Sequence, residues 1–194
     1  MPEIKDRPIL FSAPMVRAIL LGQKTVTRRE VKKQAALDCL AAGFEPAFLA
    51  LPGNADLCPY GKVGDRLWVR EAWQADEQVN AVAPRELSHG EPIQYPADGA
   101  SRQTGCSMIS PGKTRPSIHM PRWVSRILLE ITDVRVERLQ HISEEQAELE
   151  GASCDMSAWT FRDHFQKLWE SINGAESWND NPWVWVVEFK LVKS

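Results

Sequence analysis

The chain alternates apolar and polar positions in three stretches, residues 66–73, 125–139 and 183–191. A period of two is typical of β-strands that bury one face. The second stretch changes phase near Asp133, which predicts a β-bulge at that point. A short apolar run at residues 8–11 predicts one more strand.

Helix signals occur in three other stretches. Residues 13–21 carry an apolar segment that ends before a glycine. Residues 143–146 read Ser-Glu-Glu-Gln, a capping box that predicts a short helix terminated by Gly151. A third helix, which stops at Gly174, has one apolar face. That face consists of Phe161, Phe165, Leu168, Trp169 and Ile172.

The order of these elements predicts an α+β fold. The strands lie far apart in the chain, short helices separate them, and no βαβ rhythm is present, so we expect a mixed β-barrel and not a doubly wound parallel sheet. Residues 31–60 and 74–121 do not fit this pattern, and we interpret them as insertions in a single domain over residues 1–194. Residues 74–121 lack periodicity, so we expect them to shape the mouth of a pocket and to be more mobile than the barrel.

Charge argues against a protein that coats nucleic acid. The 194 residues carry a formal net charge of −3, and 43% of them are apolar, enough for a core without metal or disulfide support. Basic residues are densest over residues 24–33. This run is either a solvated face or a local contact with nucleic acid.

Cysteine and histidine positions indicate no metal site and no cofactor. None of the four cysteines has a partner at the short spacing of structural zinc sites, and the four histidines lack ligand-like neighbours. The chain starts without the pattern of a signal peptide, and no stretch has the length of a membrane span. We therefore expect a cytoplasmic protein with free thiols and no membrane partner.

Two features allow a functional interpretation beside the purely structural one. The run from Lys24 to Arg29 directly follows a helix end, and its structural interpretation is a basic edge strand. Glu150 lies in the last turn of a short helix, where the helix dipole disfavours a carboxylate. Either Glu150 is solvated on an acidic helix, or it is held near a cation from another part of the chain.

Several motifs together resemble the ASCH domain family, a branch of the PUA-like barrels. They are Ile-Leu-Leu-Gly-Gln-Lys-Thr-Val-Thr-Arg at 19–28, Val-Gly-Asp-Arg-Leu-Trp-Val at 63–69, Ile-Ser-Glu-Glu-Gln-Ala-Glu-Leu-Glu-Gly at 142–151 and Trp-Val-Val-Glu-Phe at 185–189. The additional segments 7–12 and 115–123 resemble ASCH proteins of bacteria and their prophages. The motifs span most of the chain, and the family resemblance implies a PUA-like barrel.

The resemblance also implies a function. The family has a cleft associated with RNA binding, and one bacterial branch is an amidohydrolase that removes the acetyl group of N4-acetylcytidine. The lysine, threonine and glutamate of that branch match Lys24, Thr27 and Glu150. We therefore expect a metal-independent amidohydrolase acting on N4-acylated cytosine nucleosides. The alternative is a non-catalytic PUA-like module that binds RNA through basic residues, among them Arg28 and Arg29.

The roles within this triad remain open at the level of sequence. Thr27 either attacks the acyl carbonyl or holds the water that does. Lys24 is the base if desolvation and neighbouring arginines keep it neutral; otherwise Glu150 is the base and Lys24 is an electrostatic clamp. In a regular strand Thr25, and not Lys24, shares a face with Thr27, so Thr25 is a rival nucleophile unless the segment bends.

Aromatic side chains are expected to grip the base by stacking. Residues next to or within the irregular segment 74–121 are the candidates for substrate binding, together with Arg28 and Arg29. They are Trp68, Trp73, Tyr95 and Trp123. Tryptophans in periodic segments are instead assigned to the core, namely Trp159, Trp169, Trp183 and Trp185.

Overall fold

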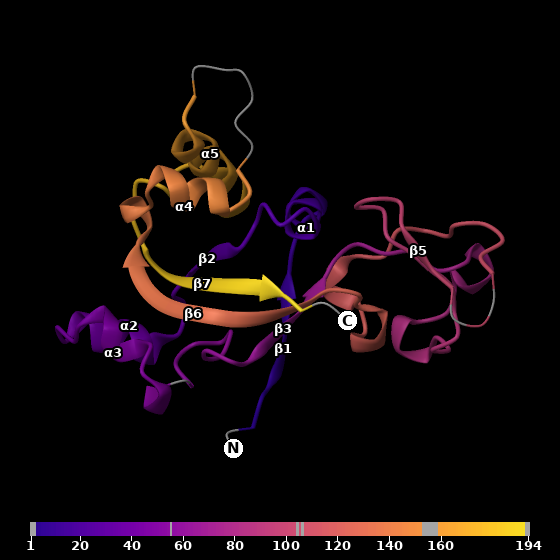
Figure 1. Ribbon diagram of the computed structural model, residues 1–194, viewed down its shortest axis with the longest axis horizontal. Coiled ribbons are helices and arrows are strands. Elements are labelled where there is room, and N and C mark those ends of the chain that lie inside the picture. Colours follow the sequence, from indigo (N-terminus) through magenta and orange to yellow (C-terminus); the bar gives the residue numbers. More distant parts are fainter. Residues whose placement is uncertain (1–2, 55, 104, 106, 153–158, 193–194) are drawn as a thin grey trace.

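The computed structural model describes residues 3–54, 56–103, 105, 107–152 and 159–192. A five-stranded sheet in the order β1-β3-β6-β7-β2 forms its centre (Figure 1). The strands are Asp6–Leu10 (β1), Val26–Glu30 (β2), Arg66–Arg70 (β3), Leu128–Arg138 (β6) and Trp183–Leu191 (β7). β1 pairs with β3 in parallel, and the other neighbours are antiparallel. A separate two-stranded sheet joins Ile93–Gln94 (β4) to Ser101–Arg102 (β5).

The α+β class predicted from the sequence is confirmed, but the barrel is not closed. Within the described residues the hydrogen-bonded sheet ends at β1 and β2, which do not pair with each other. The chain between these two edges forms helix α1 (Ala13–Leu20), and Phe11, Val16 and Ile19 of this connection are buried in the main core. Side chains of this segment, and not a fifth strand pairing, therefore lie between the two edges.

Helices lie at both sides of the curved β6–β7 pair (Figure 1). α4 and α5 lie together on one side, and α2 and α3 lie on the other. Their bounds are Gln34–Ala41 (α2), Pro46–Leu49 (α3), Glu144–Leu149 (α4) and Phe161–Asn173 (α5). Short 3-10 helices occupy Pro52–Asn54, Glu77–Val79, Pro84–Glu86, Ser117–His119, Arg122–Val124 and Leu139–His141. In the described part of the chain no helix is long and apolar enough to cross a membrane.

The strands and helices expected from periodicity are present close to their predicted bounds. The β6–β7 register shifts between Ile131 and Asp133, which confirms the predicted bulge. Ser143 and Gln146 form the predicted capping box at the start of α4. A second capping box, which the sequence pattern did not reveal, joins Thr160 to Asp163 at the start of α5.

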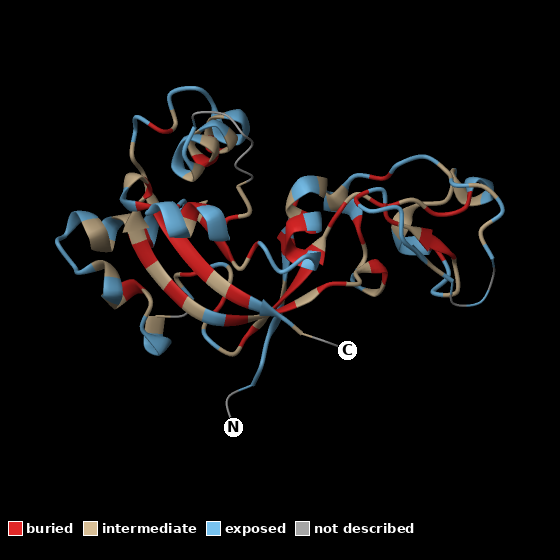
Figure 2. Ribbon diagram, turned by 45° about the horizontal axis from the view of Figure 1, so that its top comes forward, coloured by how far each residue is buried: buried red, intermediate tan, exposed pale blue. Residues whose placement is uncertain are grey.

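Buried residues concentrate in the sheet (Figure 2). The main cluster joins the sheet to α1 and to parts of residues 31–60. A second cluster packs α5 against β7 through Phe165, Trp169 and Val184, among others. Residues 74–121, which project away from α2–α5 (Figure 1), contribute to a third cluster around Trp73 and Tyr95.

Candidate functional site

The segment that precedes β2 meets the C-terminal end of α4. Lys24 and Glu150 form an isolated antiparallel bridge, and the Thr25 N–H donates to the Leu149 carbonyl oxygen at 3.0 Å. Gly151 has a φ of 80°, and a Cβ at this position would lie 3.2 Å from the Lys24 Cβ. Glycine therefore permits both the left-handed backbone and the close approach of the two segments.

The Lys24 side chain is fully buried and makes three hydrogen bonds. Its Nζ donates to Glu150 Oε2 at 2.7 Å, to the Glu150 carbonyl oxygen at 2.8 Å and to the Val26 carbonyl oxygen at 2.8 Å. An ammonium group has three N–H donors, so each donor has an acceptor. A neutral amine has only two, and one acceptor would then face its lone pair. The contacts therefore suit the ammonium form.

Arg28 holds the other oxygen of the Glu150 carboxylate. Its Nη1 lies 3.3 Å from Glu150 Oε1, and its side chain is as fully buried as that of Lys24. The Arg28 Nη2 donates to Gln146 Oε1 at 2.7 Å and to Glu137 Oε2 at 3.4 Å. Gln146 Oε1 also accepts from the Ser143 N–H, so the capping box of α4 also positions Arg28. Of the two interpretations of Glu150 left open by the sequence, the structure shows the second, in which a cation from elsewhere in the chain lies beside the carboxylate.

Two opposing effects act on the protonation of Lys24. Burial lowers the pKa of Lys24 from its ordinary value, while the Glu150 carboxylate raises it by charge attraction and hydrogen bonding. The nearby Arg29 and Arg28 guanidinium groups lower this pKa further. The net direction is downward because the ammonium is completely removed from water.

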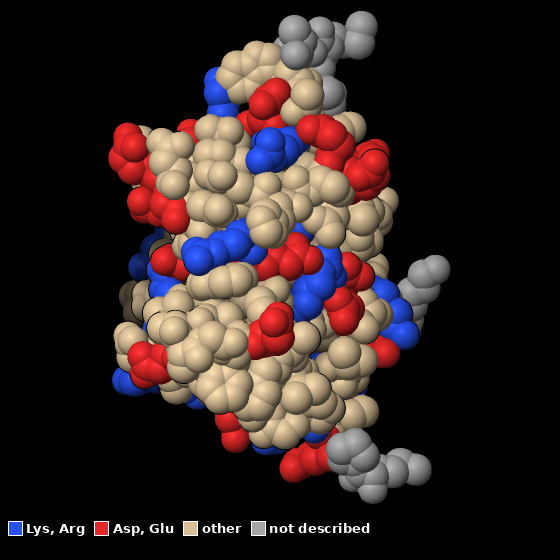
Figure 3. Space-filling model, turned by 90° about the vertical axis from the view of Figure 1, so that its left-hand side faces the viewer, with Lys and Arg blue, Asp and Glu red and all other residues tan. Residues whose placement is uncertain are grey.

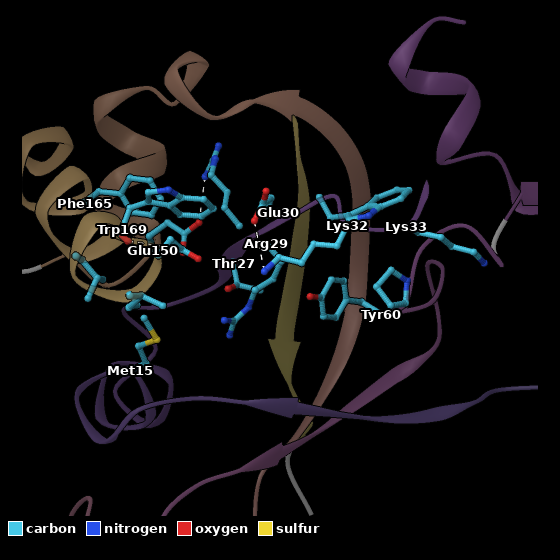
Figure 4. A pocket seen from close by; sticks show the side chains of 16 residues that line it. Met15, Thr27, Arg29, Glu30, Lys32, Lys33, Tyr60, Glu150, Phe165 and Trp169 are labelled. Carbon is cyan, nitrogen blue, oxygen red and sulfur yellow. Dashed lines mark hydrogen bonds and ion pairs between the residues drawn. The ribbon is translucent and has the colours of Figure 1, made fainter. Parts of the chain in front are cut away.

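A cavity of about 540 Å³ lies in front of this ion pair. Its volume is within the range of small-molecule sites, roughly 300–1,000 Å³. Polar groups of β2 and α4 form one wall, and the apolar face of α5 forms another (Figure 4). The lining residues are Met15, Thr27, Arg28, Arg29, Glu30, Lys32, Lys33, Pro59, Tyr60, Glu150, Phe165, Leu168, Trp169, Ile172, Asn173 and Trp185.

The three triad residues occupy different positions relative to this cavity. Thr27 and Glu150 line it, whereas Lys24 lies behind Glu150 and does not. Thr25, the rival nucleophile, is half-buried and does not line the cavity. Lys24 precedes the regular part of β2. Its Nζ nevertheless contacts both the Val26 carbonyl oxygen in that strand and the Glu150 carboxylate.

The four aromatic residues expected to bind substrate lie elsewhere. Trp68 lies beneath Arg70 and Arg122, with guanidinium carbons 4.8 and 5.7 Å from its ring centre. Trp73 and Tyr95 are buried in the third core cluster. Trp123 stacks on His89 with ring centres 4.9 Å apart. None of these four lines the cavity, because the cavity is built from β2, α4 and α5 and not from β3 or residues 74–121. None of the described residues of 74–121 lines the cavity either, and their role at the mouth of a substrate pocket stays a prediction.

Other residues, which were not expected to bind substrate, line the cavity in their place. Phe165, Trp169 and Trp185 are buried, yet each presents atoms to the cavity. Tyr60 comes from residues 31–60, in the turn Cys-Pro-Tyr-Gly. The apolar face of α5 was visible in the sequence, but only the structure shows that part of this face borders a cavity.

Basic residues at the cavity are already engaged with other groups. Arg29 Nη2 donates to the Leu10 carbonyl oxygen at 2.7 Å, and Lys32 Nζ lies 3.5 Å from Glu30 Oε2. Lys33 donates to the Asp56 carbonyl oxygen at 2.5 Å. Figure 3 shows the face that carries α2–α5, where basic and acidic side chains intermix in a band between uncharged areas. This mixture of charges is unlike the continuous basic surface expected of a phosphate-binding groove.

Potential metal ligands do not cluster in the described part of the chain: no group of three or more His, Cys, Asp or Glu side chains there is arranged to hold an ion. Cys39 and Cys58 are free thiols. Cys106 and Cys154 lie outside the described residues.

Comparisons with known proteins gave matches among solved structures. No family model and no curated protein matches the chain. An ASCH domain from Lactobacillus crispatus matches with a TM-score of 0.42 and 13% identity over 96% of this chain and 79% of that one. A DUF984 protein from Enterococcus faecalis matches with a TM-score of 0.40 and 10% identity over 91% of this chain. The chain spans 65% of the length of that protein.

Proposed function

We propose that the protein is a metal-independent amidohydrolase that removes the acyl group from N4-acetylcytidine or related N4-acylated cytosine nucleosides. The observation that carries the proposal is the buried ion pair of Lys24 with Glu150, because the Glu150 carboxylate lines a cavity together with Thr27. Burying such a pair is costly unless it is fully hydrogen-bonded, so its position at a cavity wall favours a chemical role.

The hydrogen bonds favour Glu150 as the base. All three donors of Lys24 are occupied, so Lys24 acts as a clamp that holds Glu150 and supplies positive charge. The Glu150 carboxylate lines the cavity, and each of its oxygens can accept a further hydrogen bond besides those from Lys24 and Arg28. Glu150 takes a proton from the Thr27 hydroxyl or from a water molecule beside it. The resulting oxygen attacks the acyl carbonyl carbon.

The second half of the reaction returns this proton. The bond between the carbonyl carbon and cytosine N4 breaks, and Glu150 protonates the departing nitrogen. If Thr27 has formed the new bond, a water molecule then hydrolyses its ester and regenerates the hydroxyl. The products are the carboxylic acid and cytidine, so the proposal needs no reactant other than water.

The apolar wall suits a flat base or its acyl group. Trp169 and Phe165 of α5 offer aromatic surface, and Leu168 and Ile172 extend it. Stacking of a base on an aromatic side chain contributes about 1–3 kcal/mol in single-strand binders. We assign substrate stacking to this wall and charge stabilisation to the wall made by β2 and α4.

The alternative of a non-catalytic RNA-binding module has less support. It assigned phosphate contacts to basic residues that include Lys24 and Arg28, but both side chains are fully buried and paired with carboxylates. Such groups are not accessible to a phosphate backbone. The mixed charge of the surrounding face also argues against an extended RNA contact.

Incubation of the purified protein with N4-acetylcytidine, followed by chromatography for cytidine, tests the proposal. We expect cytidine from the wild type and none above background from Glu150→Gln, which keeps the shape of the side chain. Absence of hydrolysis by folded wild-type protein, combined with salt-dependent binding of RNA, would favour the binding module instead.

A further inference from the structure

Tyr60 presents a hydroxyl to the cavity that no other group of the described chain engages. Its ring lies across the cavity from Glu150, with the hydroxyl toward Thr27 and Arg29 (Figure 4). Tyr60 is half-buried, and no other described residue forms a hydrogen bond with its hydroxyl. A phenol at a cavity wall without an internal partner is free to bind a polar atom of a ligand.

Most other donors at the site are committed to protein acceptors. The terminal nitrogens of Arg28 bind Glu150, Gln146 and Glu137, and all donors of Lys24 are occupied. Asn173 donates to the Trp169 carbonyl oxygen at 3.0 Å. Three lining side chains also carry a donor nitrogen without a partner, namely Arg28 Nε, Trp169 Nε1 and Trp185 Nε1, but these nitrogens are buried. The half-buried Tyr60 is therefore the better placed donor for the oxygen of an acyl group.

The position of Tyr60 is fixed by its surroundings. Its ring packs against the main core cluster, close to the buried Cys58. The following Gly61 has a φ of 107°, and a Cβ there would lie 2.7 Å from Asp65 Oδ2. Asp65 in turn accepts from the Lys5 N–H at 3.1 Å. The Gly61 N–H donates to the Cys58 carbonyl oxygen at 3.4 Å, and the Lys62 N–H donates to Asp65 Oδ2 at 3.3 Å. These hydrogen bonds fix the turn that carries Tyr60, as a preorganised donor requires.

The electrostatic surroundings keep this hydroxyl protonated. Burial raises the pKa of Tyr60 above its ordinary value, and the nearby Arg29 guanidinium opposes part of that rise. At neutral pH the group is a phenol and can donate a hydrogen bond.

We propose that Tyr60 is a further catalytic residue, whose hydroxyl donates a hydrogen bond to the acyl carbonyl oxygen of the substrate. This inference rests on the proposed function. When the nucleophile adds to the carbonyl carbon, the π electrons of the C=O bond move to its oxygen, and the Tyr60 O–H stabilises that charge without giving up its proton. When the C–N bond breaks, the C=O bond re-forms and the hydrogen bond weakens.

Tyr60→Phe tests the assignment because it removes one oxygen and keeps the packed ring. Loss of one oxyanion donor lowers kcat by roughly 100- to 1,000-fold in a known case, so we expect a fall of about 100-fold with little change in KM. The chain has two tyrosines, and the other supplies a matched control. Tyr95 lies outside the cavity and donates to the Val124 carbonyl oxygen at 2.7 Å, so Tyr95→Phe should lower thermal stability and leave kcat unchanged.

A second measurement reports on the hydroxyl without turnover. With 3-fluorotyrosine in place of tyrosine, the two positions give two fluorine resonances, which Tyr60→Phe assigns. N4-acetylcytidine added to the inactive Glu150→Gln variant should shift the Tyr60 resonance and leave that of Tyr95 in place.

The outcomes separate this inference from the proposed function. Wild-type hydrolysis with an unchanged kcat in Tyr60→Phe overturns the role of Tyr60 and leaves the amidohydrolase intact. A rise in KM alone also overturns it, because the hydroxyl then binds the ground state and the transition state equally. No hydrolysis by the wild type removes both.

Discussion

The Lys24 ammonium and the Glu150 carboxylate approach to 2.7 Å although 126 residues separate them in the chain. The same two residues also pair through their backbones as an isolated bridge. The end of α4 and the segment before β2 are thus joined both by a backbone bridge and by a side-chain ion pair. A change in either element is transmitted directly to the wall of the cavity that Glu150 lines.

Substitution within the triad should give strongly non-additive losses of activity. Lys24→Met, Thr27→Val and Glu150→Gln are each expected to lower kcat by at least about 100-fold, because the three act as a unit. A double variant should then be little worse than the worse single variant. Steady-state kinetics on folded protein measures this. Thr25→Ala is the control. If Thr25→Ala abolished activity while Thr27→Val remained active, Thr25 and not Thr27 would be the nucleophile.

Removal of one partner of the buried ion pair should also destabilise the fold. Glu150→Leu leaves the Lys24 charge buried and unpaired, and such changes cost about 3–5 kcal/mol. Lys24→Met together with Glu150→Leu should cost less than either change alone, since no uncompensated charge from this pair remains. Urea denaturation followed by tryptophan fluorescence gives the four free energies of unfolding. Additive losses in the double variant would contradict the coupling.

Activity should be lost in alkaline solution at a lower pH than the ordinary pKa of lysine would predict. Burial lowers the pKa of Lys24, so the clamp loses its charge below the ordinary value of about 10.4. The unfolded chain keeps this proton to higher pH than the folded protein, so the group adds to the free energy of unfolding as pH rises toward 10.4. Activity and stability are therefore expected to diverge in this range. A pH profile of kcat and of the urea midpoint, with Lys24→Met as reference, measures both.

The local stability of residues 74–121 should depend on Asp76, and it should be independent of the cavity. The Asp76 carboxylate accepts from the N–H groups of Gln78, Ile109 and Ser110 at 3.0, 2.7 and 3.3 Å. These bonds, that of Gln78 first, hold the pKa of Asp76 below its ordinary value. Their contribution to stability is present above about pH 3.9 and is lost as the pH falls through the lowered value.

Asp76→Ala should therefore speed amide exchange at Ile109 and Ser110 and leave deacylation unchanged. Glu77→Ala, at the exposed neighbour, serves as the control and should change neither. A loss of deacylation in a folded Asp76→Ala protein would instead indicate that residues 74–121 contribute to the active site. Exchange over 74–121 faster than over 125–139 in the wild type stays a prediction.

The regular elements could be predicted because their signals are local. The alternation in β6, its bulge and the capping box at Ser143 each depend on residues a few positions apart. The unusual position of Glu150 at the end of a helix was also a local signal, and it pointed correctly to a distant cation.

The identity of the cavity-lining aromatic residues could not be predicted in this way. Trp169 and Trp73 both belong to apolar stretches, and only the packing of α5 beside β2 brings the first of them to the cavity. Tyr60 gave no signal beyond a turn, because its role depends on the position of residues 31–60 against strands that are remote in sequence.

The place of β7 in the sheet has a consequence for synthesis on the ribosome. β7 is inserted between β6 and β2, and it is the strand that β2 pairs with in the described sheet. β2, which carries Thr27 and Arg28, must therefore wait unpaired until residues 183–191 have emerged, more than 150 residues later. The wall of the cavity that β2 contributes is consequently among the last parts of the molecule to form. A nascent chain stalled before β7 has two sheet edges open to wrong partners and is a natural client for chaperones.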